Sequence, residues 1–462
     1  MPNLSVFPLL LGAALAQGPC HDLLALPSIQ QDVLTTFPLS GSNCLRVDQH
    51  GLPAYAQAVG QFTLPTVVPI ASATKTLSAA VLMTLVDDGV LTLDDPVGQW
   101  LPEWNVGAKA AITLRMCFTH TSGMVESHPL ISDDTVTLRQ AAQQLANVPL
   151  AYVPGSAFAY GGVSMHVAGA VCEVASGQAW NALFQQRIAG PLGMQATDYA
   201  AFGATPNPRI AGGAQSNLGD FAAFVDMLRN GGSRNGVTVL SPAAVDLMLT
   251  DQTSWLPILA TPHPDAAPYG IGMWLERRDA TGATTLAHAA GAFGFIGWVD
   301  RAHDASGVFV VRSSNQLTFP FVQRVWQACD DALLPTGVTC LGAPSPACAG
   351  GGWANGSTAA RAGTIDFALL AAQAPPDSIA ALLLGDPLPA GVPVVDLVAY
   401  LGPAAVFATV QASADGRARV PASLVGIAPG TVVAAQFAWL AADPCAGFGL
   451  QASHAVRVTV LP

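Results

Sequence analysis

Apolar residues recur at helical spacing through the middle of the chain. Leu77, Val81 and Leu85 lie four residues apart and Gly89 follows as a stop signal, which predicts a helix over residues 72–86. The same spacing recurs in several later segments. Further helices are predicted over residues 113–123, 164–175, 180–188, 217–228 and 320–333.

Short stretches with a strand-like pattern lie on both sides of this helical part. They are separated by turns rich in Asp, Gly and Ala, which is typical of strands in an antiparallel sheet. Because strands come both first and last, we expect one sheet assembled from both ends of the segment, with a helical insertion between them. The predicted strands are residues 44–52, 54–62, 270–275, 284–288, 295–300 and 307–312.

The last quarter of the chain has a different pattern. Residues 341–363 are rich in Gly, Ala, Ser and Pro, as expected of a linker between domains. Residues 364–462 then alternate as short strands with turn signals between them, which predicts a small all-β domain with no cluster of chemically active residues. The strands are expected at residues 364–370, 380–384, 431–440 and 454–460.

The first residues form a short apolar stretch that ends in Ala14-Leu15-Ala16. This small-x-small ending is typical of a signal-peptidase site, so residues 1–16 are predicted to be an export signal, although they carry no basic residue. An apolar segment that packs on the fold is the alternative. No later run of about 18 uninterrupted apolar residues occurs, so we expect no transmembrane anchor and a secreted or periplasmic protein.

Composition narrows the function classes. The chain has 462 residues, of which 51% are hydrophobic and only 10% charged, and this fits a globular protein with a large core. Its formal net charge of −12 would repel a polyanion, so we expect no nucleic-acid partner.

The eight cysteines are even in number, which in an exported chain permits disulfides. Cys20–Cys44, Cys329–Cys340 and Cys348–Cys445 are candidate pairs, whereas Cys117 and Cys172 lie in apolar helical contexts that favour buried thiols. Neither C-x-x-C nor H-E-x-x-H occurs, so the sequence predicts no metal site and no cofactor.

Ser72-Ala73-Thr74-Lys75 is the candidate reactive motif. Residues three apart share one face of a helix, so the Ser72 hydroxyl and the Lys75 amine can meet. A deprotonated amine could remove the hydroxyl proton, which serine needs to become a nucleophile. Lys75 and Lys109 are the only lysines in the chain, and a lysine can lose its proton where an arginine cannot. An N-cap serine followed by a solvated lysine is the alternative interpretation.

The surroundings of this motif resemble the β-lactamase-related serine hydrolase family, which includes class C β-lactamases, D,D-peptidases, D-aminopeptidases and family VIII esterases. The similar segments follow the family's order over about residues 40–335. They are residues 69–75, 85–97, 114–123 and 154–160. The resemblance implies a domain over residues 20–340 with an α+β fold, in which an α/β/α sandwich with an antiparallel sheet carries a helical subdomain.

The resemblance also implies roles for single residues. Tyr160 corresponds to the family's tyrosine and would pass a proton between nucleophile and leaving group. Gly162 stands where the family usually has asparagine, which weakens the β-lactamase and peptidase interpretations. His120 and the Thr121-Ser122-Gly123 segment are expected to support the wall of the site without a catalytic role.

A third motif is expected on the strand that lines the site. His288 matches the family's histidine variant, Ala290 replaces a glycine, and the backbone N–H of Gly291 would bind the oxyanion together with that of Ser72. His288 could also be a strand-end histidine without a part in catalysis. The acidic pairs Asp87-Asp88 and Asp94-Asp95 are interpreted as solvated turn residues.

Together these observations predict a secreted serine hydrolase that cleaves an ester or amide through a Ser72 acyl-enzyme. The expected partner is a small-molecule ester, β-lactam or peptide, with cell-wall fragments among the candidates. The alternative is a penicillin- or peptidoglycan-fragment-binding protein that reacts once and turns over slowly or not at all.

Overall fold

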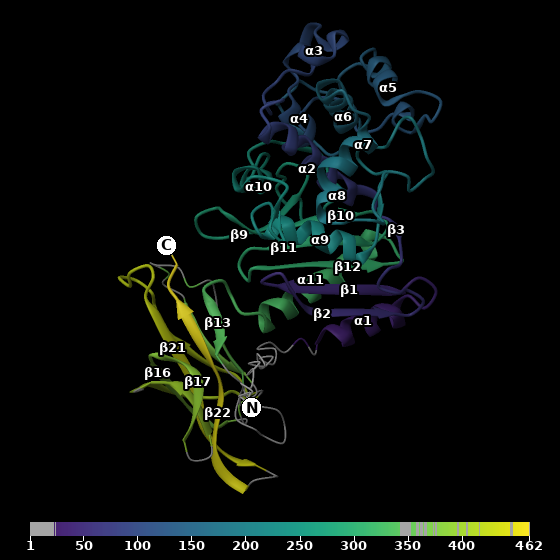
Figure 1. The fold of residues 1–462 in the computed structure, drawn as a ribbon. Coiled ribbons are helices and arrows are strands. Elements are labelled where there is room, and N and C mark those ends of the chain that lie inside the picture. Colours follow the sequence, from purple (N-terminus) through teal and green to yellow (C-terminus); the bar gives the residue numbers. More distant parts are fainter. Residues whose placement is uncertain are drawn as a thin grey trace, which may run out of the picture. The chain divides into compact units, whose positions relative to one another are not determined.

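The computed structural model describes residue 23, residues 25–341 and, with short gaps, residues 353–461. The chain divides into two compact units. The larger spans Leu23–Ala332, and the smaller lies within Leu333–Pro462 (Figure 1). The predicted export signal lies outside the described residues.

The larger unit is built on one six-stranded antiparallel sheet with the order β2-β1-β12-β11-β10-β9. Strand β1 from the start of the unit pairs along its whole length with β12 from its end, which confirms a sheet assembled from both ends. Its strands are β1 (Asn43–Gln49), β2 (Leu52–Val59), β9 (Trp274–Arg278), β10 (Thr284–Gly291), β11 (Phe295–Asp300) and β12 (Ala305–Val311).

Helices cover both faces of this sheet. Neighbouring residues of a strand face opposite sides, and Gly297 of β11 faces Phe221 of α9 whereas Trp298 contacts Trp326 of α11. Helices α2 and α9 share one apolar core, and α1 packs against α11. This confirms the predicted α/β/α sandwich. The covering helices are α1 (Ala25–Thr36), α2 (Thr74–Asp87), α9 (Leu218–Arg229) and α11 (Asn315–Ala332).

A helical subdomain is inserted between β2 and β9. Thr113 caps α4 through Met116 N as predicted, but α4 ends at Phe118, before the expected Gly123. Its α-helices are α3 (Val97–Trp100), α4 (Leu114–Phe118), α5 (Leu138–Leu145), α6 (Val163–Ser176), α7 (Trp180–Phe184), α8 (Gly190–Leu192) and α10 (Pro242–Met248).

Short elements complete the larger unit. Its tight 3₁₀ turns are η1 (Ala71–Ala73), η2 (Pro102–Trp104), η3 (Gly107–Ala111) and η4 (Pro129–Ser132), and η5 (Gln185–Ala189) is a wider π-helical turn. Its short strands are β3 (Val68–Pro69), β4 (Phe158–Ala159), β5 (Gln215–Ser216), β6 (Ser233–Arg234), β7 (Val237–Thr238) and β8 (Ile258–Ala260). Across the described part of the chain, we find no helix with the length and apolar character that crossing a bilayer requires.

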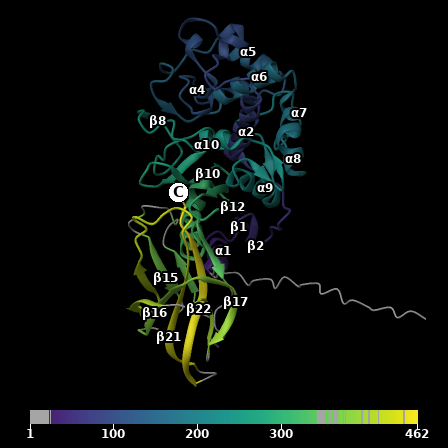
Figure 2. The same ribbon diagram turned by 60° about the vertical axis from the view of Figure 1, so that its left-hand side comes forward.

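The smaller unit is all-β, as predicted. A five-stranded sheet has the order β13-β22-β21-β16-β19, and its long strands β21 and β22 lie side by side in Figure 2. A three-stranded sheet β14-β15-β20 shares its apolar core, where Leu382 and Phe437 of the first sheet join Leu369 and Val420 of the second. The strands of these two sheets are β13 (Val338–Leu341), β14 (Trp353–Gly356), β15 (Ala368–Ala372), β16 (Ile379–Gly385), β19 (Ala405–Gln411), β20 (Ala418–Pro421), β21 (Val432–Asp443) and β22 (Gly447–Thr459).

Two further strands, β17 (Pro387–Val394) and β18 (Leu397–Leu401), form a hairpin. Strand β14 lies within residues 341–363, the segment expected to be a linker.

The described cysteines do not follow the predicted local pairings. Cys44, on β1, and Cys329, on α11, are buried free thiols, so neither Cys20–Cys44 nor Cys329–Cys340 is formed. Cys117 and Cys172 are also free and buried, as expected. All four thiols lie in element interiors, where they pack as small apolar groups. Cys20, Cys348 and Cys445 lie outside the described residues.

Candidate active site

Ser72 and Lys75 lie where the chain enters helix α2. Ser72 is the middle residue of the tight turn η1, and Lys75 follows in the first turn of α2. Ala71 has a φ of +45°, a conformation that costs an alanine about 1–2 kcal/mol and that the surrounding structure must hold in place. Lys75 Nζ lies 3.2 Å from Ser72 Oγ and donates a second hydrogen bond of 2.9 Å to the carbonyl of Ala211.

The Lys75 amine is buried without a carboxylate partner among the described residues. Lys75 is only 4% exposed. The two atoms that accept hydrogen bonds from its amine, Ser72 Oγ and the Ala211 carbonyl oxygen, are both neutral. Burial penalises the charged form of a lysine and lowers the pKa of Lys75 to about 7. A large fraction of the amine is therefore unprotonated near neutral pH and able to accept the serine proton.

Tyr160 forms the third side of this arrangement. Its backbone N–H donates to the Ala260 carbonyl at 3.0 Å, and its ring stacks on Trp274 with a centroid separation of 5.2 Å. Lys75 Nζ lies 4.5 Å from the centre of the tyrosine ring. Burial raises the pKa of Tyr160, and hydrogen bonding to Ser72 opposes only part of that rise. The phenol therefore remains protonated at neutral pH, which suits a group that relays a proton and not the primary base.

His120 supports the tyrosine from behind. Its ring centroid lies 4.5 Å from that of Tyr160 and 4.9 Å from that of Tyr269, and its backbone has a φ of +59°. Burial lowers the pKa of His120, and the nearby Lys75 charge lowers it further, so the ring stays neutral. His120 thus packs behind Tyr160 as part of the wall of the site, in agreement with the supporting role predicted from the sequence.

Gly291, at the end of β10, lies against the turn that carries the serine. Strand β9 pairs with β10 only as far as His288, so residues 289–291 extend beyond that pairing. A Cβ atom on Gly291 would lie 2.0 Å from the carbonyl oxygen of Ile70, two residues before Ser72. Only glycine allows this approach, and it brings the backbone of Gly291 close to the turn that contains Ser72.

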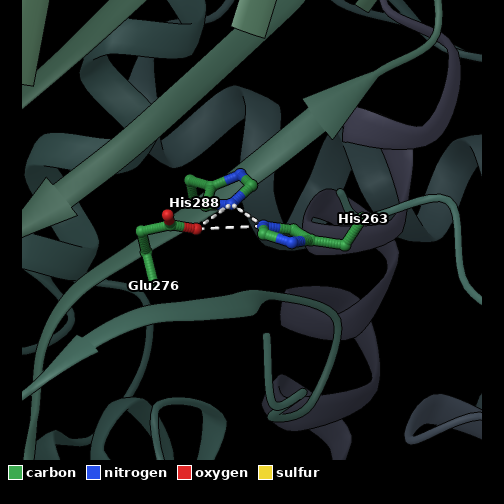
Figure 3. Close-up of side chains that lie close together, drawn as sticks. All are labelled: His263, Glu276 and His288. Carbon is green, nitrogen blue, oxygen red and sulfur yellow. Dashed lines mark hydrogen bonds and ion pairs between the residues drawn. The ribbon is translucent and has the colours of Figure 1, made fainter. Parts of the chain in front are cut away.

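His288 lies beside this end of β10 but is engaged in a buried cluster (Figure 3). His263 Nε2 lies 2.9 Å from Glu276 Oε2, and His288 Nε2 lies 3.2 Å from the same oxygen. The two imidazole nitrogens are 3.3 Å apart. Burial alone would raise the pKa of Glu276, but hydrogen bonds from both histidines outweigh it and lower the pKa to about 2. The cluster therefore holds an ionised carboxylate and ties the segment before β9 to β9 and β10.

Two histidines and a carboxylate are also ligands that Zn²⁺ accepts, so we tested whether they fit a metal. His263 Nδ1 accepts backbone N–H bonds from Asp265 at 3.2 Å and Ala267 at 3.4 Å. A neutral imidazole that accepts at Nδ1 carries its proton on Nε2 and cannot ligate a metal there, because a metal-bound histidine donates from its other nitrogen. We therefore interpret the cluster as a hydrogen-bonded network.

Two cavities meet at the reactive residues. One, of about 500 Å³, is lined by Ser72, Tyr160, Ala290 and the edges of His263 and His288. The other, of about 650 Å³, lies on the Lys75 side and includes Gly162 in its lining. Glu126 borders both cavities.

Sequence reasoning identified Ser72, Lys75, Tyr160, Gly162, His288, Ala290 and Gly291. The first six line these two cavities, and Gly291 lies against Ile70 beside the turn that carries Ser72. It missed the Ala211 carbonyl, which holds Lys75, and the Trp274 ring, which supports Tyr160. Neither residue belongs to a motif. The short strand Trp274–Arg278 gives no local signal that its first side chain supports Tyr160.

The low pKa of Lys75 can be measured directly, because the chain contains only two lysines. NMR titration of the full chain labelled with ¹³C at lysine Cε should show one resonance that titrates near pH 7. Lys109→Arg should leave that resonance in place and remove the other. If both lysines titrate above pH 9, burial does not deprotonate Lys75.

Comparison with known proteins places this site in a family. The family model described as Beta-lactamase matches residues 46–332. Esterase EstB of Burkholderia gladioli is 35% identical over 148 residues, which cover 28% of this chain and 38% of EstB. The chain thus spans about two fifths of the length of that curated relative.

Two further matches extend over more of the chain. Lovastatin esterase of Penicillium rubens is 25% identical over 371 residues. This match covers 61% of this chain and 91% of the lovastatin esterase. The solved structure of a β-lactamase-like protein from Bacteroides dorei superposes with a TM-score of 0.59 at 29% identity, covering 66% of this chain and 98% of that one. Since the family model matches more than half of the chain and includes Ser72 and Lys75, the chain belongs to the Beta-lactamase family.

Proposed function

We propose that this protein is an esterase-type serine hydrolase that forms an acyl-enzyme on Ser72. The observation that carries the proposal is the buried Lys75 amine, which lies 3.2 Å from Ser72 Oγ with a pKa lowered to about 7. A base matched to neutral pH is what a serine hydroxyl needs to attack a carbonyl carbon.

In the first step Ser72 Oγ bonds to the carbonyl carbon, the C=O electron pair moves to the oxygen, and Lys75 Nζ takes the hydroxyl proton. Backbone N–H groups of Ser72 and Gly291 would hold the oxyanion. As the oxyanion collapses, the bond to the alcohol oxygen breaks. Tyr160 gives its proton to that oxygen and regains one from Lys75. Water then repeats the sequence on the acyl-enzyme and releases the acid.

An ester is the favoured substrate over a β-lactam or a D-amino-acid peptide. Gly162 and Ala290 differ from the residues that the β-lactamase and peptidase members of the family use at these positions. EstB and the lovastatin esterase are both named for ester hydrolysis, which agrees with this choice. The alternative function is that of a penicillin-binding protein, which is acylated once and turns over slowly or not at all.

We also propose that the protein is exported to the periplasm or the exterior. The apolar stretch over residues 6–16, with its Ala14-Leu15-Ala16 ending, supports this. N-terminal sequencing of protein secreted by an expressing bacterium tests it, and an intact residue 1 would argue against it.

Substitution of Ser72 and Lys75 tests the proposed chemistry. Ser72→Ala should lower kcat for p-nitrophenyl butyrate at least about a thousandfold, because the nucleophile is lost. Lys75→Arg should be nearly as damaging as Lys75→Ala, since a guanidinium keeps its proton. The melting temperature should be reported for each variant, and Lys109→Arg serves as the matched control.

A Ser72→Ala variant with wild-type turnover would remove Ser72 as the nucleophile. A Lys75→Arg variant with wild-type turnover would show that only positive charge is needed. Stoichiometric labelling by a fluorescent penicillin without turnover of any ester would favour the slow penicillin-binding alternative.

Gly291 offers an independent test of the oxyanion site. Gly291→Ala places a methyl group 2.0 Å from the Ile70 carbonyl oxygen and must push β10 away from the serine turn. We expect kcat to fall about a hundredfold, as when one oxyanion donor is lost. Gly219→Ala, in the first turn of α9 and clear of close contacts, is the control. Unchanged kcat in a folded Gly291→Ala variant would show that this strand end does not contact the oxyanion.

A further inference from the structure

The larger of the two cavities is lined by Lys75, whereas the smaller one is lined by Ser72 and Tyr160. It holds about 650 Å³, which is enough for a chain of several carbon atoms with a head group. Its walls come from residues 126–132, Gly162 and the turn at residues 209–212. A cavity that begins at the catalytic amine is a natural place for one part of the substrate.

Apart from Lys75, Arg209 is the residue that brings a permanent positive charge to the lining of this cavity. Its guanidinium stacks on the Phe202 ring at 4.5 Å from the ring centre, and its side chain is 29% exposed. Among the described residues, the ion-pair partner of Arg209 is Asp134, whose side chain is 54% exposed. The distance of 3.9 Å between Arg209 Nη2 and Asp134 Oδ2 is too long for a hydrogen bond. The guanidinium is therefore held in place by the ring and retains hydrogen-bond donors for an anion.

The turn that carries Arg209 is fixed to the catalytic amine. The Arg209 carbonyl accepts hydrogen bonds from Gly212 N at 3.0 Å and Gly213 N at 2.7 Å. The Ala211 carbonyl in the same turn accepts the hydrogen bond from Lys75 Nζ. The backbone of Arg209 is thus held in a hydrogen-bonded turn that also binds Lys75.

Gly162 keeps the path through the cavity open. A Cβ atom there would lie 3.3 Å from Ile131 Cδ1 and 3.4 Å from Ala211 Cβ, so a longer side chain would have to extend into the cavity. Glu126, at the boundary of both cavities, carries a negative charge beside the reactive residues. That carboxylate repels an anion near the scissile bond and leaves the Arg209 end as the favourable position for one.

We infer that this cavity binds the acyl chain of the substrate and that Arg209 binds a carboxylate at the far end of that chain. The preferred substrates are then monoesters of short dicarboxylic acids. This inference rests on the proposed ester hydrolysis, and it names Arg209 as the residue that determines acyl specificity.

Three p-nitrophenyl esters of matched shape test it: the glutarate monoester, the neutral 5-methylhexanoate and the cationic 4-(trimethylammonio)butanoate. At low ionic strength kcat/KM should be about five- to tenfold higher for the glutarate ester than for the neutral one, and this ratio should fall as salt is added. Arg209→Met should lower kcat/KM for the glutarate ester and bring the ratio to about one. Arg209→Lys should retain part of it.

Arg324→Met is the matched control, because Arg324 is an exposed arginine of α11 that does not line either cavity. A ratio near one in the wild type, or a ratio that survives Arg209→Met, would overturn the inference. Faster hydrolysis of the cationic ester would also overturn it and assign charge recognition to Glu126.

A binding measurement separates this inference from the proposed catalysis. Calorimetry with Ser72→Ala should show glutarate binding at least about fivefold more tightly than 5-methylhexanoate, and adding Arg209→Met should remove the difference. Because no turnover is required, failure of ester hydrolysis with this binding intact would contradict only the proposed function. Equal binding of both acids would contradict the inference even if the enzyme hydrolyses esters.

Discussion

The site depends on the burial of one ammonium group without a counter-ion in contact with it. Lys75 is held between a serine hydroxyl and a backbone carbonyl, and neither acceptor carries the charge that would stabilise the protonated amine. A surface lysine would stay charged well above neutral pH, and a lysine paired with a carboxylate would be protonated more firmly still. Removing both water and counter-ion is therefore what makes a lysine usable as a base.

The remaining architecture supplies that environment. Helix α2 is buried along nearly its whole length between the sheet and the helical subdomain, so its first turn is shielded from water. The helical subdomain contributes Tyr160 and the Ala211 carbonyl, and the sheet contributes Trp274 and Gly291. Because β1 pairs with β12, both ends of this unit are closed into one sheet, and β10 is held against the turn that contains Ser72.

Sequence patterns predicted the elements that have clear local signals. β11 matches its predicted range of 295–300, and the helix expected over 72–86 appears as η1 followed by α2. α11 begins at Asn315, five residues before its predicted start, and contains Pro320 in its interior. α1 was not predicted, although its buried residues Leu26, Ile29 and Val33 recur at helical spacing.

For the site, Ser72 and Lys75 could be found because their spacing is local and fixed by helix geometry, and Tyr160, His288 and Gly291 could be found only through the family resemblance. The environment that changes the chemistry of Lys75 could not be predicted in this way. Ala211 is 136 residues away in sequence, and nothing in the residues around it indicates that its carbonyl holds an amine. The His263–Glu276–His288 cluster likewise joins three segments that only the fold brings together.

The most direct test of this account is the pH dependence of acylation in the wild-type protein. The rate at which a fluorophosphonate probe modifies Ser72, located by peptide mass spectrometry, should rise with pH and level off above an inflection near pH 7, where Lys75 loses its proton. The Ser72 adduct and this inflection together are the predicted result. Modification of a different residue, or a rate that keeps rising to pH 9 or above without an inflection near 7, would contradict the claim that buried Lys75 activates Ser72.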